Sequence, residues 1–198
     1  MSWKNSKENG GVNMEEREVK YRQDLLSQIK NAYGKVVYSY TIHWKQQNLY
    51  STNAGRIKIA EITLNSISTT GLLGFLIFSQ WWAALAGTIF SAVSLGLSLY
   101  TKEVKYDKLI SAHRMTADEL WVLRERYVSL MTDFQMMNLN DIVKRRDELE
   151  IEAARIYRTA AQTTGKAYEK AQKALKQEEE QFFTNEELNL MLPPHLRT

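Results

Sequence analysis

A stretch of 40 residues, from Ile62 to Thr101, contains no charged side chain, although 25% of the residues in the whole chain are charged. A single α-helix of that length would be about 60 Å long, whereas the hydrocarbon core of a bilayer is about 30 Å thick. The stretch is therefore too long to cross a membrane once and is close to the length needed to cross it twice. We predict a transmembrane hairpin over residues 56–101, with spans at about 57–78 and 81–100.

Only Ser79 and Gln80 separate the two predicted spans, so the hairpin must turn tightly. Trp81 and Trp82 follow this turn. Indole rings favour the interface between lipid headgroups and acyl chains. The turn is therefore expected to lie at one surface of the membrane.

Basic residues flank the hairpin only at its open end. Arg56 and Lys58 stand at the start of the first span, and Lys102, Lys105 and Lys108 follow the second, while the turn has no charge. Under the positive-inside rule, lysine and arginine mark the cytoplasmic ends of the spans. We expect both termini to be cytoplasmic and the protein to lie in a bacterial inner membrane, with the lipid bilayer as its first partner.

The rest of the chain is polar and rich in helix-forming residues, and its two prolines and nine glycines leave few breaks. The predicted fold class is an all-α membrane protein, in which a two-helix transmembrane hairpin carries long cytoplasmic helices of coiled-coil type. Five regions are expected: a disordered tail (1–14), N-terminal cytoplasmic helices (15–55), the hairpin (56–101), a cytoplasmic helical hairpin (102–181), and a short C-terminal helix with a tail (182–198).

Before the membrane, two separate helices are predicted. The first runs from Glu15 to Tyr33 and is closed by Gly34. Val36–Leu49 is rich in β-branched and aromatic residues and could form a strand, but helical spacing of its apolar residues favours a helix. Ser51–Gly55 is expected to break the chain before the first span.

After the membrane, one helix is predicted from Lys102 to Phe134, and a last long helix from Asp141 to Gln181. Asn138 and Thr184 have the residue type and position of helix N-caps. Apolar residues in the first of these helices follow alternating steps of three and four, which is typical of a coiled-coil seam. This candidate oligomer seam comprises Leu120, Leu123, Tyr127, Leu130 and Phe134.

Small and polar residues form a row on each predicted span. Small residues let helix backbones approach closely, so packing within the hairpin is the favoured interpretation. The alternative is that the rows line a water-filled path in an oligomer, because two helices alone cannot enclose a pore. The candidate pore or hairpin-packing face comprises Glu61, Asn65 and Ser68 on the first span and Gly87, Ser91, Ser94 and Ser98 on the second.

No motif predicts an enzyme. The chain lacks cysteine, and His43, His113 and His195 are scattered without the spacing of metal ligands. No Gly-rich phosphate loop or nucleophile motif is present. We therefore expect no catalytic residue, no metal and no cofactor, and a net charge of +3 does not suggest direct nucleic-acid binding.

Several short motifs, in their order around the hairpin, resemble the SLATT domain family of two-transmembrane effectors. Upstream of the second span they are YTIH (40–43) and STTG (68–71). Downstream of it they are YTK (100–102), HRMTADELWVL (113–123), RERYVSLMTD (124–133), RRDEL (145–149), AQKALK (171–176) and LPP (192–194). One departure is the absence of a proline at 160–162, where relatives are expected to have one; its absence leaves the bend of the last helix open.

The resemblance implies an effector of bacterial anti-phage defence that forms a pore or disrupts the inner membrane when a partner triggers it. The implied state is a homo-oligomer. The implied upstream partner is a cyclic-oligonucleotide synthase, a nucleotide sensor or a defence-associated reverse transcriptase. An alternative is a membrane-anchored coiled-coil scaffold that recruits a cytoplasmic defence enzyme. A third interpretation is a nucleotide receptor with a pocket lined by Arg114, Arg124 or Arg126.

Overall fold

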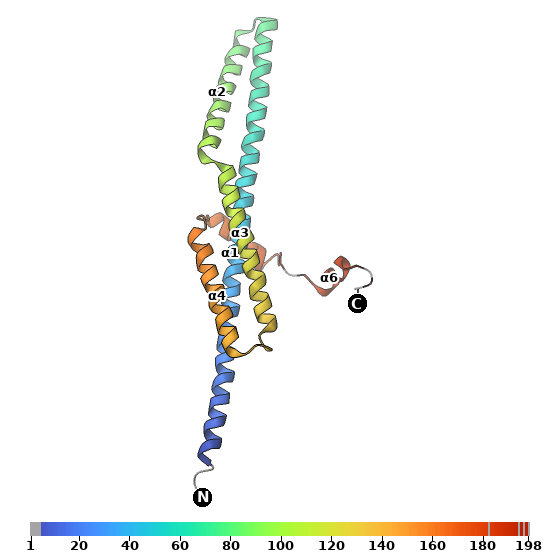
Figure 1. Cartoon of the computed structure of the whole chain (residues 1–198). Helices are drawn as coiled ribbons and strands as arrows, with labels where there is room; N and C mark the ends of the chain where they lie inside the picture. The colour runs from blue at the N-terminus through green and yellow to red at the C-terminus, as the bar shows by residue number, and fades with distance from the viewer. Residues whose placement is uncertain (1–4, 182, 194, 196, 198) are drawn as a thin grey trace.

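The computed structural model is an elongated bundle of helices (Figure 1). It describes residues 5–181, 183–193, 195 and 197, and their side chains except those of residues 5–13 and 78. Within this part of the chain every regular element is a helix, which confirms the all-α prediction. The helices are α1 (Asn5–Phe78), α2 (Trp81–Val104), α3 (Tyr106–Asp133), α4 (Leu139–Thr159), α5 (Gly165–Lys176) and α6 (Asn185–Met191).

Helix α1 is continuous over 74 residues, which corresponds to a length of about 110 Å. The predicted helix end at Gly34 and the predicted break at Ser51–Gly55 are therefore wrong. A glycine inside a helix costs only about 1 kcal/mol, and α1 packs against α3, α5 and α2 in turn along its length. These contacts outweigh the local preference for a break.

The prediction of a disordered N-terminal tail is also wrong for the residues that the structure describes. The backbone is helical from Asn5 onward, so residues 5–14 continue α1, while residues 1–4 of that tail lie outside the described residues. Once a helix is nucleated, each further residue adds one hydrogen bond for one residue ordered. Extension through Gly10 and Gly11 follows from that cooperativity.

The helix after the membrane does not begin where the sequence predicts. Helix α2 runs on to Val104, and Lys105 adopts a left-handed conformation (φ 52°, ψ 50°) before α3 starts at Tyr106. The Lys105 N–H donates to the Thr101 carbonyl at 3.1 Å, which closes α2. The second hairpin helix and α3 are thus two elements joined by a one-residue hinge.

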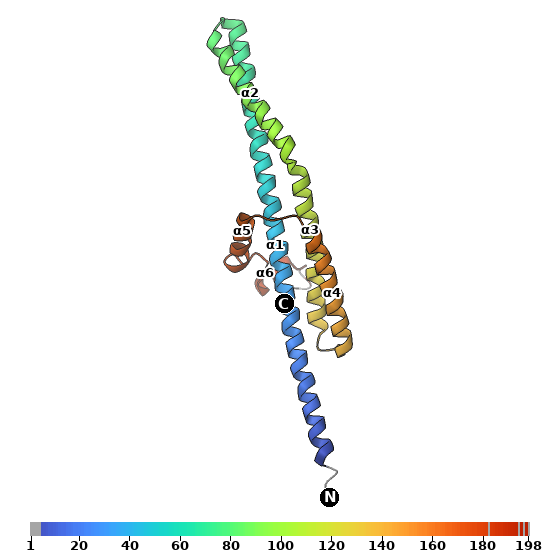
Figure 2. The same cartoon turned by 90° about the vertical axis from the view of Figure 1, so that its left-hand side faces the viewer.

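The single long helix predicted from Asp141 to Gln181 is also wrong. Helix α4 ends at Thr159, and α5 begins at Gly165 after an extended linker. The linker crosses α1, so α5 packs on the side of α1 away from α3 and α4 (Figure 2). The chain breaks here without a proline.

Contacts with α1 explain the position of this break. The side chain of Thr164 caps α5 by accepting from the Ala167 N–H. The side-chain oxygen of the buried Gln46 on α1 accepts from the Thr164 N–H at 2.9 Å and from its hydroxyl at 2.7 Å. The turn is therefore stabilised by a residue 118 positions earlier in the chain.

Two predicted helix caps are confirmed. The side chain of Asn138 accepts from the Asp141 N–H at the start of α4. Thr184 forms a capping box with Glu187 at the start of α6, and α6 ends at Met191. Of the C-terminal tail predicted after it, residues 194, 196 and 198 lie outside the described residues.

The hydrophobic core lies where α3 and α4 pack against the middle of α1. All five residues of the predicted oligomer seam belong to it, and each is at most 5% exposed. In this structure the candidate oligomer seam lies inside a single chain, because α1 and α4 of the same chain enclose it. Their partners in the core are Leu25, Ile29, Val36, Ile142, Leu149 and Ile156.

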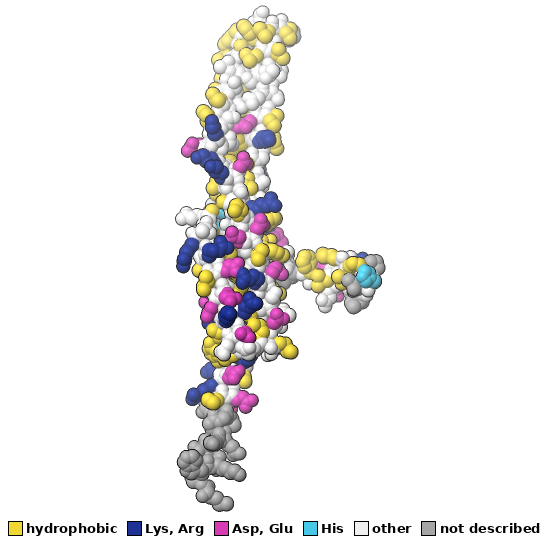
Figure 3. All heavy atoms as spheres, viewed as in Figure 1, with side chains coloured by type: hydrophobic (Ala, Val, Ile, Leu, Met, Phe, Trp, Pro, Cys, Tyr) yellow, Lys and Arg dark blue, Asp and Glu magenta, His cyan; other side chains and the backbone are white. Residues whose placement is uncertain are grey.

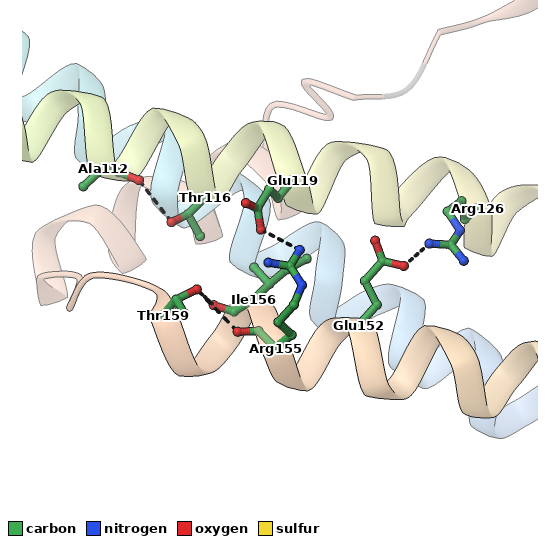
Figure 4. Close-up of polar contacts among 8 residues, drawn as sticks. All are labelled: Ala112, Thr116, Glu119, Arg126, Glu152, Arg155, Ile156 and Thr159. Atoms are coloured by element: carbon green, nitrogen blue, oxygen red, sulfur yellow. Dashed lines mark hydrogen bonds and ion pairs between the residues drawn. The ribbon is translucent and has the colours of Figure 1, made fainter.

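Ion pairs flank this core at the contact of α3 with α4 (Figure 4). Glu119 accepts from Arg155 at 3.0 Å, and Arg126 pairs with Glu152. Exposed pairs of this kind contribute at most about 1 kcal/mol each. They set the alignment of α3 on α4 more than the stability of the contact.

We predict that Leu123→Ala lowers the free energy of unfolding of the single chain by about 2–5 kcal/mol, because it opens a cavity in a fully buried site. The neighbouring Val122, which is 55% exposed, supplies the control, and Val122→Ala should cost less than about 0.5 kcal/mol. Urea unfolding followed by circular dichroism in detergent measures both. If Leu123→Ala left the unfolding midpoint unchanged but altered the oligomeric state, the result would indicate that the seam joins different protomers.

Candidate functional site

The hairpin of α1 and α2 is the part of the molecule with the clearest functional character. Its turn consists of Ser79, in a left-handed conformation (φ 54°), and Gln80. Trp81 and Trp82 are 71% and 60% exposed at this tip. One helical stretch in α1 and one in α2 are long and apolar enough to cross a membrane, as the sequence predicts.

The two helix backbones touch near the tip. A Cβ atom on Gly71 would lie 2.8 Å from the Ala83 carbonyl oxygen, and one on Gly87 would lie 2.9 Å from the Ser68 carbonyl oxygen. Both distances are shorter than a non-bonded contact allows, so only glycine fits at these positions. Gly87 was identified from the sequence, whereas Gly71 was not, although its small size is the signal that could have found it.

Hydrogen bonds join the same surfaces. The Ser68 hydroxyl, buried between the helices, donates to the Gly87 carbonyl at 2.7 Å. Ser94, only 3% exposed, lies in the same contact. Ser98 donates to a Glu61 carboxylate oxygen at 3.0 Å, near the open end of the hairpin. The structure therefore places Ser68 and Gly87 in the contact between α1 and α2, and Glu61 and Ser98 in a hydrogen bond across it.

Asn65 and Ser91, the other two predicted residues, are exposed on the outside of the hairpin. They belong to a polar zone half-way along the spans, which we call the mid-span band. On α1 most side chains between 63 and 70 are polar, and all of the polar ones except Ser68 are exposed. The band comprises Thr63, Asn65, Ser66, Thr69, Thr70, Thr88 and Ser91.

The hydroxyl groups of the band differ from its one amide. Thr63, Ser66 and Thr69 each donate to a carbonyl one turn back on α1, at 2.8–2.9 Å. Such bonds satisfy the hydroxyl inside its own helix. The Asn65 amide has no hydrogen-bond partner among the described residues. In Figure 3 this zone is largely pale, between a hydrophobic tip and the first charged side chains.

A comparison with protein families agrees with this architecture. Residues 25–187 match the family model described as "SMODS and SLOG-associating 2TM effector domain family 4", abbreviated SLATT. The chain belongs to the SLATT family. The match spans both hairpin helices and α3 to α5, so SLATT membership covers the hairpin and the helices that pack beyond its open end. No curated protein and no solved structure shows a significant match.

The three arginines considered for a nucleotide pocket do not converge. Arg114 lies 3.9 Å from Asp118, and Arg124 pairs with Glu125 at 2.6 Å while its guanidinium lies over Trp121. Arg126 forms an ion pair with Glu152 on α4. Each therefore has an acidic partner on its own or a neighbouring helix, and the pocket hypothesis has no support from their placement.

A buried histidine pair links α1 to α3, and sequence reasoning missed it. The Nδ1 atoms of His43 and His113 are 2.9 Å apart, so one ring donates to the other. The two side chains are 6% and 0% exposed, and the Tyr50 ring lies 5.6 Å from that of His113. With 70 residues between them, no spacing in the sequence signals the contact.

The environment of the pair holds both rings neutral. Burial, and to a smaller extent the adjacent His113, lower the pKa of His43 to about 4. Burial also lowers the pKa of His113. The hydrogen bond between the two rings joins α1 to α3, and no cluster of three or more possible metal ligands is present within the described residues.

We predict that replacing Gly71 with alanine disrupts the hairpin, because the new Cβ would collide with the Ala83 carbonyl. Overpacking of this kind costs about 1–3 kcal/mol. Gly96→Ala is the matched control, since a Cβ there meets nothing within 4 Å. Thermal unfolding in detergent should show a lowered midpoint for the Gly71 variant alone. Equal midpoints for both variants would contradict the close contact.

We predict that the folded chain loses stability as the pH falls from 6.5 towards about 4. Below its ordinary pKa, His43 takes up a proton in the unfolded chain but not in the folded one, so protonation favours unfolding. The slope is at most about 1.4 kcal/mol per pH unit for each proton. Melting temperatures across this range should fall less steeply for His43→Gln than for the natural chain. His195→Gln, at an exposed histidine, should keep the natural slope.

Proposed function

We propose that this SLATT protein is a membrane effector of bacterial anti-phage defence. Several copies assemble their hairpins in the inner membrane, form a pore or disrupt the bilayer, and cause growth arrest or cell death. Both termini lie in the cytoplasm, where a partner triggers the assembly.

The mid-span band is the observation that supports this proposal. A polar group that faces hydrocarbon without a hydrogen bond is costly. The exposed Asn65 amide sits at the depth where no water or headgroup reaches a lone hairpin. A neighbouring copy or a water-filled path would supply the missing hydrogen bonds, whereas lipid would not.

The rigid connection between membrane and cytoplasm supports a triggered mechanism. Helix α1 passes without a break from the cytoplasmic core into the first span, so a partner that shifts the core would also move the hairpin. The family description associates SLATT domains with SMODS and SLOG proteins. We therefore propose as partner a cyclic-oligonucleotide synthase or a nucleotide sensor, and a defence-associated reverse transcriptase as a third candidate.

The distribution of charges supports this orientation. The basic residues of the hairpin gather at its open end, and its tip is uncharged. By the positive-inside rule the open end faces the cytoplasm. This places α3 to α6 where a cytoplasmic partner can reach them.

We predict that Asn65→Leu abolishes most of the membrane damage while the protein still inserts, because leucine removes the polar group and lowers the cost of insertion. Release of a dye from liposomes, or loss of membrane potential in cells with the trigger, measures the effect. Ile67→Leu, at an exposed position of the same turn, is the control and should stay active. Full activity of the Asn65 variant would exclude a role for the band in permeation.

A second candidate function is a membrane-anchored scaffold that recruits a cytoplasmic enzyme. It is favoured by large apolar side chains left exposed on the cytoplasmic helices, such as Val122 (55%) and Ile151 (72%). Replacing residues 57–100 with an unrelated transmembrane hairpin distinguishes the two. A scaffold would keep its protective effect in cells, whereas an effector that acts through its spans would lose it.

A further inference from the structure

A hollow of about 530 Å³ lies where α1, α2 and α3 meet, at the open end of the membrane hairpin. On α1 it is bordered by residues 54–61, around the start of the predicted first span, and on the other side by the junction of α2 with α3. Its lining comprises Ala54, Lys58, Glu61, Thr101, Lys102, Lys105, Tyr106, Asp107 and Lys108.

The hollow is built mainly from cations. Four lysines line it and only two carboxylates, those of Glu61 and Asp107. Ser98 already donates to Glu61. Within the described part of the chain none of the four lysines forms an ion pair. The hollow therefore has an excess of positive charge, which a bound anion would neutralise.

The hinge between α2 and α3 contributes directly to this arrangement. Lys105 is left-handed, a conformation that costs a non-glycine residue about 1–2 kcal/mol. The break starts a new helix at Tyr106, and residues on both sides of the break line the hollow. A lysine, rather than a glycine, occupies the hinge.

The position of the hollow indicates which kind of anion would bind there. It lies directly beyond the Glu61–Ser98 hydrogen bond, the last polar contact inside the hairpin. With the spans in a bilayer, this is the depth of the lipid phosphates. Acyl chains could run along the exposed apolar side chains near the open end, such as Ile59, Ile62 and Leu99.

We propose that this hollow binds the phosphate headgroup of an anionic phospholipid, with Lys58, Lys102 and Lys105 as its main contacts. Bound there, the lipid bridges the first span to the hinge and stabilises the angle between α2 and α3. The proposal deepens the proposed function by naming a lipid for the hairpin, but it requires only that the hairpin lies in a bilayer, not that it conducts.

Native mass spectrometry of the full chain in a neutral detergent tests this site. Dioleoylphosphatidylglycerol should remain bound at concentrations where dioleoylphosphatidylcholine does not. The triple variant Lys58→Gln, Lys102→Gln, Lys105→Asn should bind the anionic lipid at least about tenfold more weakly, since each lysine near a membrane surface contributes appreciably. Asparagine is chosen at the hinge because it tolerates the left-handed conformation.

The control triple variant, Lys144→Gln, Lys166→Gln, Lys176→Gln, removes the same charge from exposed cytoplasmic positions. It should bind the lipid as the natural chain does. Equal weakening by both triple variants, or equal retention of the two lipids, would overturn the site. If the site variant fails to fold by circular dichroism, Lys102→Gln alone replaces it and should still weaken binding measurably.

Two competitors separate a lipid from a soluble phosphate. Inorganic phosphate and ATP, each in large excess, should leave the bound phosphatidylglycerol in place, because neither has acyl chains to lie on the hairpin. Displacement by ATP would assign the hollow to a soluble nucleotide and overturn the lipid proposal. Dye release plays no part in this readout, so failure of pore formation and failure of lipid binding are separate outcomes.

Discussion

The continuity of α1 is the constraint on which the other contacts depend. Helices α2, α3, α4 and α5 all pack against α1: α2 along the predicted membrane span and the others along the part of α1 that precedes it. The core around Leu25 and Ile29, the histidine pair at His43 and the serine contact at Ser68 lie on the same unbroken helix. A helix moves as a unit when its backbone hydrogen bonds are intact. The core and the hairpin are therefore connected by one unbroken helix, whereas the connection through α3 and α2 is interrupted at Lys105.

The polar residues of the hairpin divide into two groups with different physical roles. Ser68, Gly87 and Ser94 lie between the helices, where close approach and one short hydrogen bond hold α1 to α2. Asn65 and Ser91 face outward at the same depth. The first group holds the two helices of the hairpin together. The second leaves polar side chains on the outer surface, where lipid offers them no hydrogen bonds. The proposed assembly of several hairpins would use both properties.

Local patterns predicted the parts of the fold that local physics controls. The spans, the tight turn and the caps at Asn138 and Thr184 depend on hydropathy or on hydrogen bonds between residues three apart, and all were found as predicted. The apolar seam of α3 was located correctly from its spacing, but its partner was not. A seam of leucines fits a helix of the same chain as well as one from another copy, and only the packing of α1 and α4 decided between them.

The sequence by itself determined that the chain is helical and that its uncharged block doubles back, because the length of an apolar segment and the need to satisfy backbone hydrogen bonds in lipid are properties of the segment alone. The tertiary structure decided where the helices break. Glycine at 34 and 55 did not end α1, whereas the chain turns at Lys105 and between Thr159 and Gly165. Local propensities differ by about 1 kcal/mol, so contacts such as Gln46 with Thr164, made across more than a hundred residues, outweigh them.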